Sequence, residues 1–106
     1  MRALNPLSPE DASLLEAVAR GEYTINGFRN RDIQSILFAD QLLDQTKKRS
    51  IAAKVTRKIR MLRAHGLVRK IAHTHRYTLT DNGRRAVAAL IAARNADVDS
   101  LAKLAA

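Results

Sequence analysis

Apolar residues recur at helical spacing in four stretches of the chain, which are separated by short polar or glycine-containing links. The first helix is predicted over residues 9–20. Ser8 can cap this helix, Pro9 suits its first turn, and Gly21 follows the last residue of the apolar pattern. The stretch therefore predicts an amphipathic helix whose two ends are both marked in the sequence.

The second helix and the links around it are less regular. Residues 23–25 are β-prone and precede an Asn-Gly pair, so they predict one brief strand or an extended link. Asn30 resembles a helix cap, and the apolar spacing after it predicts a helix over residues 31–38. Residues 39–46 have weak periodicity and predict a polar connection, with or without a turn of helix.

The third helix is the most regular of the four. It is predicted over residues 49–65, because no proline or glycine interrupts it and Gly66 follows its end. Its apolar residues recur at spacings of four, four and three positions, at Ile51, Val55, Ile59 and Leu62. This spacing places them on one face of the helix, which we expect to be buried.

After the third helix the pattern changes from helical to extended. Residues 67–72 and 76–79 are β-compatible and predict a hairpin whose connection is His73-Thr74-His75. Thr80 then resembles the cap of a last helix over residues 81–104. The chain is thus expected to be mainly α-helical with one small β-hairpin.

Three helices followed by a hairpin is the element order of a winged helix-turn-helix domain. Under this interpretation residues 1–106 form one domain, with the helix-turn-helix over residues 31–65, the wing over residues 67–79 and a C-terminal helix over residues 81–104. The predicted fold is a three-helix core with a wing and a C-terminal helix.

The end of the third helix and the hairpin resemble a known family. The stretch "IRMLRAHGLVRKIAHTHRYTLTDNGRRAVAAL" is similar to the recognition-helix end, wing and following helix of MarR-type bacterial regulators. Gly66 matches the glycine that ends their recognition helix, Tyr77 and Leu79 match their second wing strand, and Gly83 matches the glycine that opens their last helix. "GFRNRDIQ" and "LRAHGLVRK" also resemble the C-terminal module of longer uncharacterised bacterial proteins. The first resemblance implies a DNA-binding winged helix.

Positive charge is concentrated in one segment of the chain. Residues 47–76 carry eleven basic side chains and no acidic one, whereas residues 1–46 carry four basic and seven acidic side chains. The basic segment is also rich in apolar residues, so it is expected to be a folded element and not a solvated tail. With a net charge of +9, the chain favours a polyanionic partner, and for this fold we expect double-stranded DNA ahead of RNA.

Helical geometry separates the third helix into an apolar stripe and a basic face. At about 100° per residue, the side opposite Ile51 collects arginines that can fork onto guanine and a threonine that can contact a base edge. The predicted base-reading residues are Arg49, Thr56, Arg57 and Arg60. The predicted phosphate contacts are on the flanks and near the start of the helix, at Lys47, Lys48, Lys54, Lys58 and Arg63. A surface helix without such a partner ordinarily mixes acidic and basic residues, and this one has no acidic residue.

The predicted hairpin is basic as well. A hairpin of this charge suits the backbone or minor groove of DNA. Its predicted contacts are Arg69, Lys70, His73, His75 and Arg76. The alternative is that these residues only keep an exposed strand edge in solution. We favour contact with DNA because the hairpin and the third helix carry charge of the same sign.

The clustering of His65, His73 and His75 raises the question of a metal or catalytic site. A hairpin tip encloses no cavity, the surrounding cations repel a metal ion, and no glutamate follows Asp44. We therefore expect no metal, no cofactor and no enzymatic activity.

Composition bears on the compartment. The chain has no cysteine, so neither a disulfide framework nor a thiolate zinc site is available. Its longest apolar run, residues 86–93, is far shorter than the roughly 20 residues that span a bilayer. We expect a cytoplasmic protein with no membrane partner.

The last helix carries more apolar residues than a single buried stripe requires. Part of this surface is expected to pack on the first helix. The remainder is interpreted as core, as the seam of a homodimer, or as a contact with a larger protein. A winged helix used for protein interaction is therefore the second hypothesis, and a two-fold dimer would place two recognition helices roughly 34 Å apart.

Overall fold

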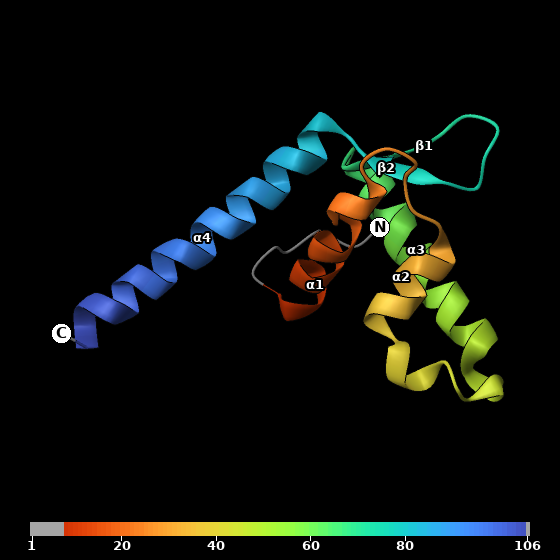
Figure 1. Ribbon diagram of the computed structural model, residues 1–106, viewed down its shortest axis with the longest axis horizontal. Helices are drawn as coiled ribbons and strands as arrows, with labels where there is room; N and C mark the ends of the chain where they lie inside the picture. Colours follow the sequence, from red (N-terminus) through yellow and green to blue (C-terminus); the bar gives the residue numbers. More distant parts are fainter. Residues whose placement is uncertain (1–7, 106) are drawn as a thin grey trace.

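The computed structural model describes the backbone of residues 8–105 and the side chains of residues 8–97. In this range the chain forms four α-helices, three short 3-10 helices and one two-stranded antiparallel sheet (Figure 1). The helices are α1 (Pro9–Val18), α2 (Asn30–Leu37), α3 (Lys48–Ala64) and α4 (Asp81–Ala105), and the strands are β1 (Val68–Lys70) and β2 (Tyr77–Leu79). The prediction of a mainly helical chain with one small hairpin is confirmed.

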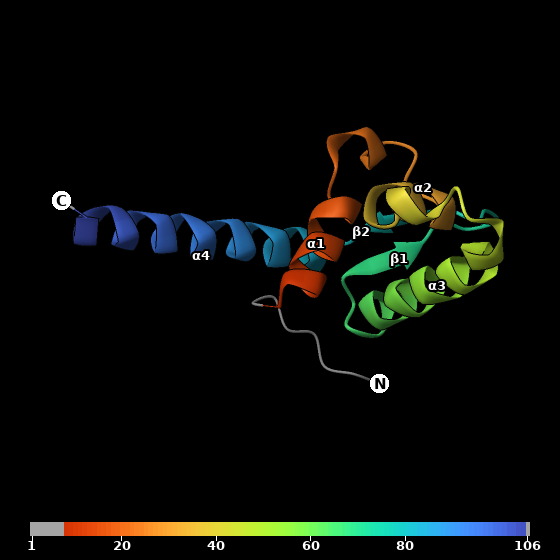
Figure 2. The same ribbon diagram turned by 90° about the horizontal axis from the view of Figure 1, so that it is seen from below.

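Helices α1, α2 and α3 pack around one core, and α4 runs away from this body for most of its length (Figures 1 and 2). The core draws on all of these elements and on the sheet, through residues that include Leu14, Leu15, Phe28, Ile33, Val55, Leu62, Val68 and Leu90. Among the described side chains of α4, Leu90 is the last that is buried in this core, since Ile91 to Asp97 are all exposed. Within residues 8–105, no helix has both the length and the apolar character needed to cross a membrane.

Helix α1 begins as predicted and ends two residues earlier. The Ser8 hydroxyl accepts a hydrogen bond from the Asp11 backbone N–H at 3.4 Å, and Pro9 occupies the first turn. The helix ends at Val18 because the backbone becomes extended at Arg20, where ψ is 138°. A short 3-10 helix, Gly21–Tyr23, then changes the direction of the chain.

The strand or extended link predicted at residues 23–25 does not form. These residues end a 3-10 helix and continue as a turn, which leaves Ile25 89% exposed. The extended residue is instead Phe28, which bridges Tyr77 because each backbone N–H donates to the other's carbonyl oxygen at 2.8 Å. Burial of the Phe28 ring beside Tyr23 and Tyr77 fixes this bridge, with ring centres 6.0 and 5.9 Å apart.

Helix α2 begins one residue earlier than predicted, so that Asn30 is its first residue and not its cap. The Arg29 backbone N–H donates to Asp32 Oδ2 at 2.7 Å and closes the start of the helix. Two 3-10 helices, Ala39–Gln41 and Gln45–Lys47, then form the polar connection that the sequence predicted.

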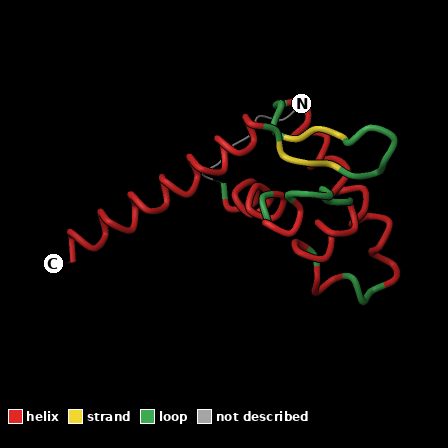
Figure 3. The backbone as a smooth tube through the Cα atoms, turned by 45° about the horizontal axis from the view of Figure 1, so that its top comes forward, coloured by secondary structure: helices red, strands yellow, loops and turns green. Residues whose placement is uncertain are grey.

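Helix α3 and the hairpin follow the predicted order, with shorter strands. Gly66 ends α3 in the left-handed conformation, with φ of 72°, and β1 and β2 then pair with Arg69 opposite Thr78. Residues 71–76 form a loop, part of which was predicted as strand. Thr74 shapes this loop, because its hydroxyl donates to the Ile71 carbonyl at 2.7 Å and accepts from the Arg76 N–H at 3.0 Å. The loop extends beyond the two strands (Figure 3).

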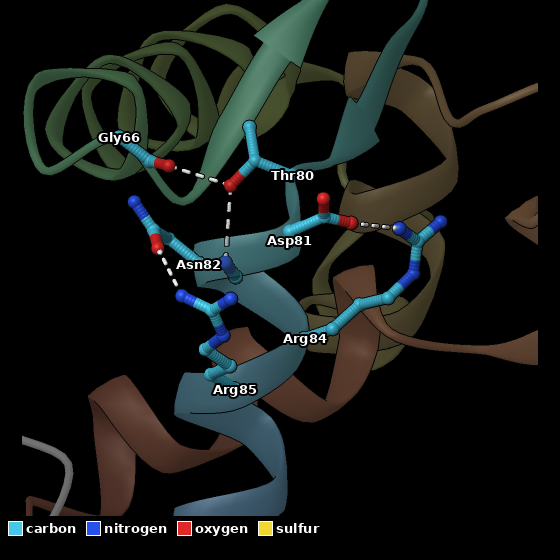
Figure 4. A network of polar contacts seen from close by, with 7 residues as sticks. Gly66, Thr80, Asp81, Asn82, Arg84 and Arg85 are labelled. Carbon is cyan, nitrogen blue, oxygen red and sulfur yellow. Dashed lines mark hydrogen bonds and ion pairs between the residues drawn. The ribbon is translucent and has the colours of Figure 1, made fainter.

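Thr80 joins the end of α3 to the start of α4 (Figure 4). Its hydroxyl accepts a hydrogen bond from the Gly83 backbone N–H at 3.0 Å, as expected of a helix cap, and donates to the Gly66 carbonyl at 2.6 Å. Gly83 lies close to the hairpin here, since an added Cβ would be 2.1 Å from the Leu67 carbonyl oxygen. The first turn of α4 is therefore fixed to the body by both packing and hydrogen bonds.

Replacing Thr80 with valine is expected to lower the free energy of unfolding by about 1–2 kcal/mol, because it removes the cap and the bond to Gly66 with little change in volume. Urea denaturation followed by circular dichroism measures this loss. Thr78→Val is the matched control, since Thr78 lies on β2 and its hydroxyl has no hydrogen bond among the described residues. An equal loss in the two variants would contradict the role given to Thr80.

Candidate nucleic-acid interface

Helix α3 is held to the body by its apolar face, as predicted. The four residues of the predicted stripe are at most 3% exposed, and Met61 beside them is also buried. The opposite face is open to solvent and carries Arg49, Ala53, Arg57 and Arg60. Because the buried stripe fixes the helix, these exposed side chains project from a rigid backbone.

Asn30 fastens α2 to the middle of α3. Its Nδ2 donates to the Ala52 carbonyl at 3.2 Å and to Thr56 Oγ1 at 3.0 Å, while its Oδ1 accepts from Gln34 at 2.6 Å. The Thr56 hydroxyl itself donates to the Ala52 carbonyl at 2.9 Å. The Thr56 hydroxyl thus supports the packing of α2 on α3, which leaves only the rest of this exposed side chain for the base contact that the sequence predicted.

Lys58 lies outside the exposed basic face, contrary to the expectation of a phosphate contact. Its ammonium forms an ion pair with Glu10 of α1, and its side chain is only 11% exposed. The helical position of Lys58 on the flank of α3 was predicted correctly, but Glu10 of α1 pairs with its ammonium there. Lys58 therefore links α3 to α1 and is not available to a polyanion in this arrangement.

The other two predicted flank cations lie over aromatic rings. Lys54 Nζ is 5.9 Å from the centre of the Phe38 ring, and the Arg63 guanidinium carbon is 5.8 Å from the centre of the Tyr77 ring. Both cationic residues are exposed, so the rings orient them without removing them from solvent. Such contacts contribute about 0.5–1 kcal/mol at exposed sites. Lys54 and Arg63 thus lie on the two flanks of the α3 face that carries Arg57.

The turn before α3 is held by Asp44. The hydroxyl and the backbone N–H of Thr46 both donate to Asp44 Oδ1, at 2.6 and 2.9 Å. These bonds, the one from the hydroxyl first, lower the pKa of Asp44 below its ordinary value. The ionised carboxylate therefore fixes the 3-10 turn from which the exposed Lys47, Lys48 and Arg49 follow.

The hairpin presents a second group of exposed cations. Arg69 and Lys70 lie on β1, and His73 and His75 lie in the loop beyond it, all four exposed, whereas Arg76 is half-buried. His73 has a φ of 61°, which helps the loop to reverse direction. The loop that carries both histidines extends beyond the sheet (Figure 3).

Few basic side chains of residues 47–76 pair with an acidic residue within the described part of the chain. Of the eleven basic side chains in residues 47–76, only Lys58 forms an ion pair within the described part of the chain. The remaining cations, together with the two loop histidines, are called the basic surface here: Lys47, Lys48, Arg49, Lys54, Arg57, Arg60, Arg63, Arg69, Lys70, His73, His75 and Arg76. Its positive charge is largely uncompensated and attracts polyanions.

The three histidines do not converge. His65 lies at the end of α3, where its backbone N–H donates to the Met61 carbonyl at 3.2 Å, while His73 and His75 lie in the hairpin loop. In the residues that the structure describes, no three histidine, aspartate or glutamate side chains come together in a way that could hold a metal ion.

Asn30 is the residue of this interface whose role the sequence pattern missed. Its side-chain partners on α3 are 22 and 26 residues away in sequence, so no local signal marks the contact. Because Asn30 precedes an apolar helical pattern, the sequence indicated that it caps the helix. The only sequence feature that could have indicated this contact is the short amide side chain of Asn30 at the start of a helix.

No protein-family model, curated protein or solved structure matches this chain. The geometry and the charge of the basic surface are therefore the observations that bear on function.

Proposed function

We propose that this chain is a DNA-binding protein of the winged helix-turn-helix fold, acting as a transcriptional regulator or as a DNA-tethering module. The observation that carries the proposal is the exposed face of α3, which is cationic and lies opposite a fully buried apolar stripe. The major groove of B-DNA, about 12 Å wide, accepts an α-helix. Helix α3 is the only helix of the described chain that presents such a face.

Within this proposal the exposed residues of α3 divide into two roles. Arg57 and Arg60 read bases, since each guanidinium can donate two hydrogen bonds to one guanine, and Arg49 acts about two to three turns earlier on the same face. The Thr56 hydroxyl is already bonded to Asn30 and to the Ala52 carbonyl, so only the rest of the Thr56 side chain is open to a base contact. The phosphate contacts are Lys47, Lys48, Lys54 and Arg63.

The hairpin acts as the wing in this proposal. Arg69 and Lys70 on β1, with His73, His75 and Arg76 in the loop, contact the DNA backbone or an adjacent minor groove. Support comes from the shared sign of the charges on α3 and on the hairpin, and from the position of the loop beyond the sheet.

Selection from a pool of random duplexes tests whether the protein reads sequence. We expect enrichment of a short site that contains guanines in the major groove, because arginine is the predicted reading residue. If no sequence is enriched after repeated rounds, sequence-specific reading is contradicted and only the role as a DNA-tethering module remains. Stronger enrichment from a matched RNA pool would replace the DNA proposal with an RNA-binding one.

A homodimer through α4 is a second proposal, favoured by the way this helix leaves the body. Beyond Leu90, the residues from Ile91 to Asp97 are exposed, although Arg94 pairs with Glu16 of α1, so this part of the helix keeps exposed apolar surface. The apolar residues Val98, Leu101 and Leu104 continue the helix, and their side chains lie outside the described residues.

Sedimentation velocity at tens of micromolar is expected to give twice the chain mass if α4 is a dimer seam. In that case two copies of α3 read half-sites of one palindrome. A species of single chain mass would contradict the dimer and favour attachment of α4 to a larger protein.

A further inference from the structure

A small hollow of about 120 Å³ lies where α3 meets the start of α2 and strand β2. One stripe of α3 at helical spacing lines one side of it, through Thr56, Ile59, Arg60 and Arg63. Asn30 of α2 and Tyr77 of β2 complete the lining. Sites for small organic molecules measure about 300–1,000 Å³, whereas one water occupies roughly 30 Å³ in the liquid. The hollow therefore suits a group of a few heavy atoms and not an organic effector.

The walls of the hollow are held in place by contacts within the protein. Asn30 is hydrogen-bonded to the Ala52 carbonyl and to the Thr56 hydroxyl, at 3.2 and 3.0 Å. The Tyr77 backbone exchanges two hydrogen bonds with Phe28, and the two rings stack with their centres 5.9 Å apart. The shape of the hollow is thus set before any ligand binds, which lowers the entropic cost of binding.

The polar groups that remain free around the hollow can all donate hydrogen bonds. Arg60 and Arg63 are exposed and have no acidic partner among the described residues, and no acidic residue lines the hollow. The Tyr77 hydroxyl also has no hydrogen-bond partner within the described part of the chain. Because the Arg63 guanidinium carbon lies 5.8 Å from the centre of the Tyr77 ring, the two side chains orient each other. This set of donors suits a small anion with several acceptor oxygens.

We propose that this hollow binds one phosphate group, which the DNA backbone supplies, between the Arg63 guanidinium and the Tyr77 hydroxyl. A backbone phosphate carries one negative charge and two non-bridging oxygens, so each donor can take one oxygen. Arg60 adds positive charge at the rim and belongs also to the exposed face of α3. A phosphate held at this position fixes the register of α3 on the duplex. The inference rests on the proposed function and adds Tyr77 to the residues that contact DNA.

Tyr77→Phe tests the proposed phosphate contact, because it removes the hydroxyl but keeps the ring that packs on Phe28 and carries Arg63. We expect the Kd for the selected duplex to rise at least about threefold, measured by fluorescence anisotropy. Tyr23→Phe is the matched control, since Tyr23 also contacts the Phe28 ring, with centres 6.0 Å apart, but lies outside the hollow. An equal rise in the two variants, or a rise of less than about threefold in Tyr77→Phe, would overturn the contact.

Neutralising single phosphates of the duplex shows whether one phosphate occupies the hollow. Each phosphate is replaced in turn by an uncharged methylphosphonate, and the Kd is measured for the parent chain and for Tyr77→Phe. We expect one position in each binding site at which neutralisation weakens the parent at least about threefold more than the variant, because the variant has already lost part of that contact. If every position costs the two chains the same, no phosphate is bound by Tyr77 and the inference is wrong.

Arg63→Gln gives an independent readout. Loss of one phosphate contact by a cation should flatten the salt dependence of duplex binding by about 0.9 and weaken all sequences to the same degree. An unchanged salt slope, or a loss confined to particular base sequences, would contradict a phosphate contact by Arg63.

A duplex that does not bind the parent chain at all would end the proposed function and leave a free phosphate compound as the candidate occupant. Isothermal titration calorimetry of the full chain with inorganic pyrophosphate decides that case. Saturable binding with a Kd below about 5 mM, weakened at least about threefold by Tyr77→Phe and not by Tyr23→Phe, would support the phosphate site and overturn DNA as its source. Absence of such binding would overturn the site as well.

Discussion

Replacing Arg57 and Arg60 together with glutamine is expected to weaken duplex binding by about 2 kcal/mol or more, roughly a thirtyfold rise in Kd. Both arginines are exposed opposite the buried stripe of α3, and neither has an acidic partner among the described residues. Glutamine has no charge and lacks the guanidinium fork, which donates from two nitrogens to one guanine. Fluorescence anisotropy with the duplex recovered from selection measures the loss, and base preference should be relaxed as well as weakened.

The matched control is the double replacement of Arg84 and Arg85 with glutamine. These arginines lie in the first turn of α4 and are engaged by Asp81 and Asn82 (Figure 4). The control removes the same charge from the chain, but from a position outside the basic surface. We expect less than about a threefold change, because both arginines already have partners on α4 and neither lies on the face of α3 that is proposed to read bases. If both pairs lose equally, only net charge matters and α3 is not the reading helix.

Gly27→Ala is expected to lower the free energy of unfolding by about 2–5 kcal/mol. Gly27 has φ of 74°, a conformation that alanine adopts with strain, and an added Cβ would lie 2.4 Å from the Tyr77 carbonyl oxygen. That oxygen accepts the Phe28 N–H in the bridge that joins the start of α2 to the hairpin. The substitution therefore strains the turn and opens the bridge at the same time.

Two other glycines separate these effects. Gly66 has φ of 72° with open space around it, so Gly66→Ala is expected to cost only the strain of the left-handed conformation, about 1–2 kcal/mol. Gly21 has neither a positive φ nor a close neighbour, and Gly21→Ala is expected to change stability by less than about 0.5 kcal/mol. Urea denaturation of the three variants should rank them in this order. A Gly27 variant as stable as the Gly21 variant is incompatible with the Phe28–Tyr77 bridge.

Helix α3 was the part of the fold most fully predictable from sequence. Its apolar spacing is a local property, and Ile51, Val55, Ile59 and Leu62 are all buried as that spacing requires. The Thr80 cap was predictable for the same reason, because its bond to Gly83 spans three residues. Patterns within a few turns of chain decide such features before any tertiary contact forms.

Several failures involve contacts between residues far apart in the sequence. Residues 23–25 have β-prone side chains, but burial of Phe28 against Tyr77 placed the bridge further along. Lys58 sits on the predicted flank of α3, yet Glu10 is 48 residues away and no pattern in α3 announces it.

The most direct measurement of the central claim is the affinity for a labelled DNA duplex of about 20 base pairs as a function of salt. If the basic surface binds DNA, the Kd should be below about 10 μM near 50 mM salt. A plot of the logarithm of the association constant against the logarithm of the salt concentration should have a slope of about −0.9 per phosphate neutralised, and of about −4 or steeper in total. Failure to bind any duplex more tightly than about 10 μM at this salt concentration would contradict DNA binding by this protein.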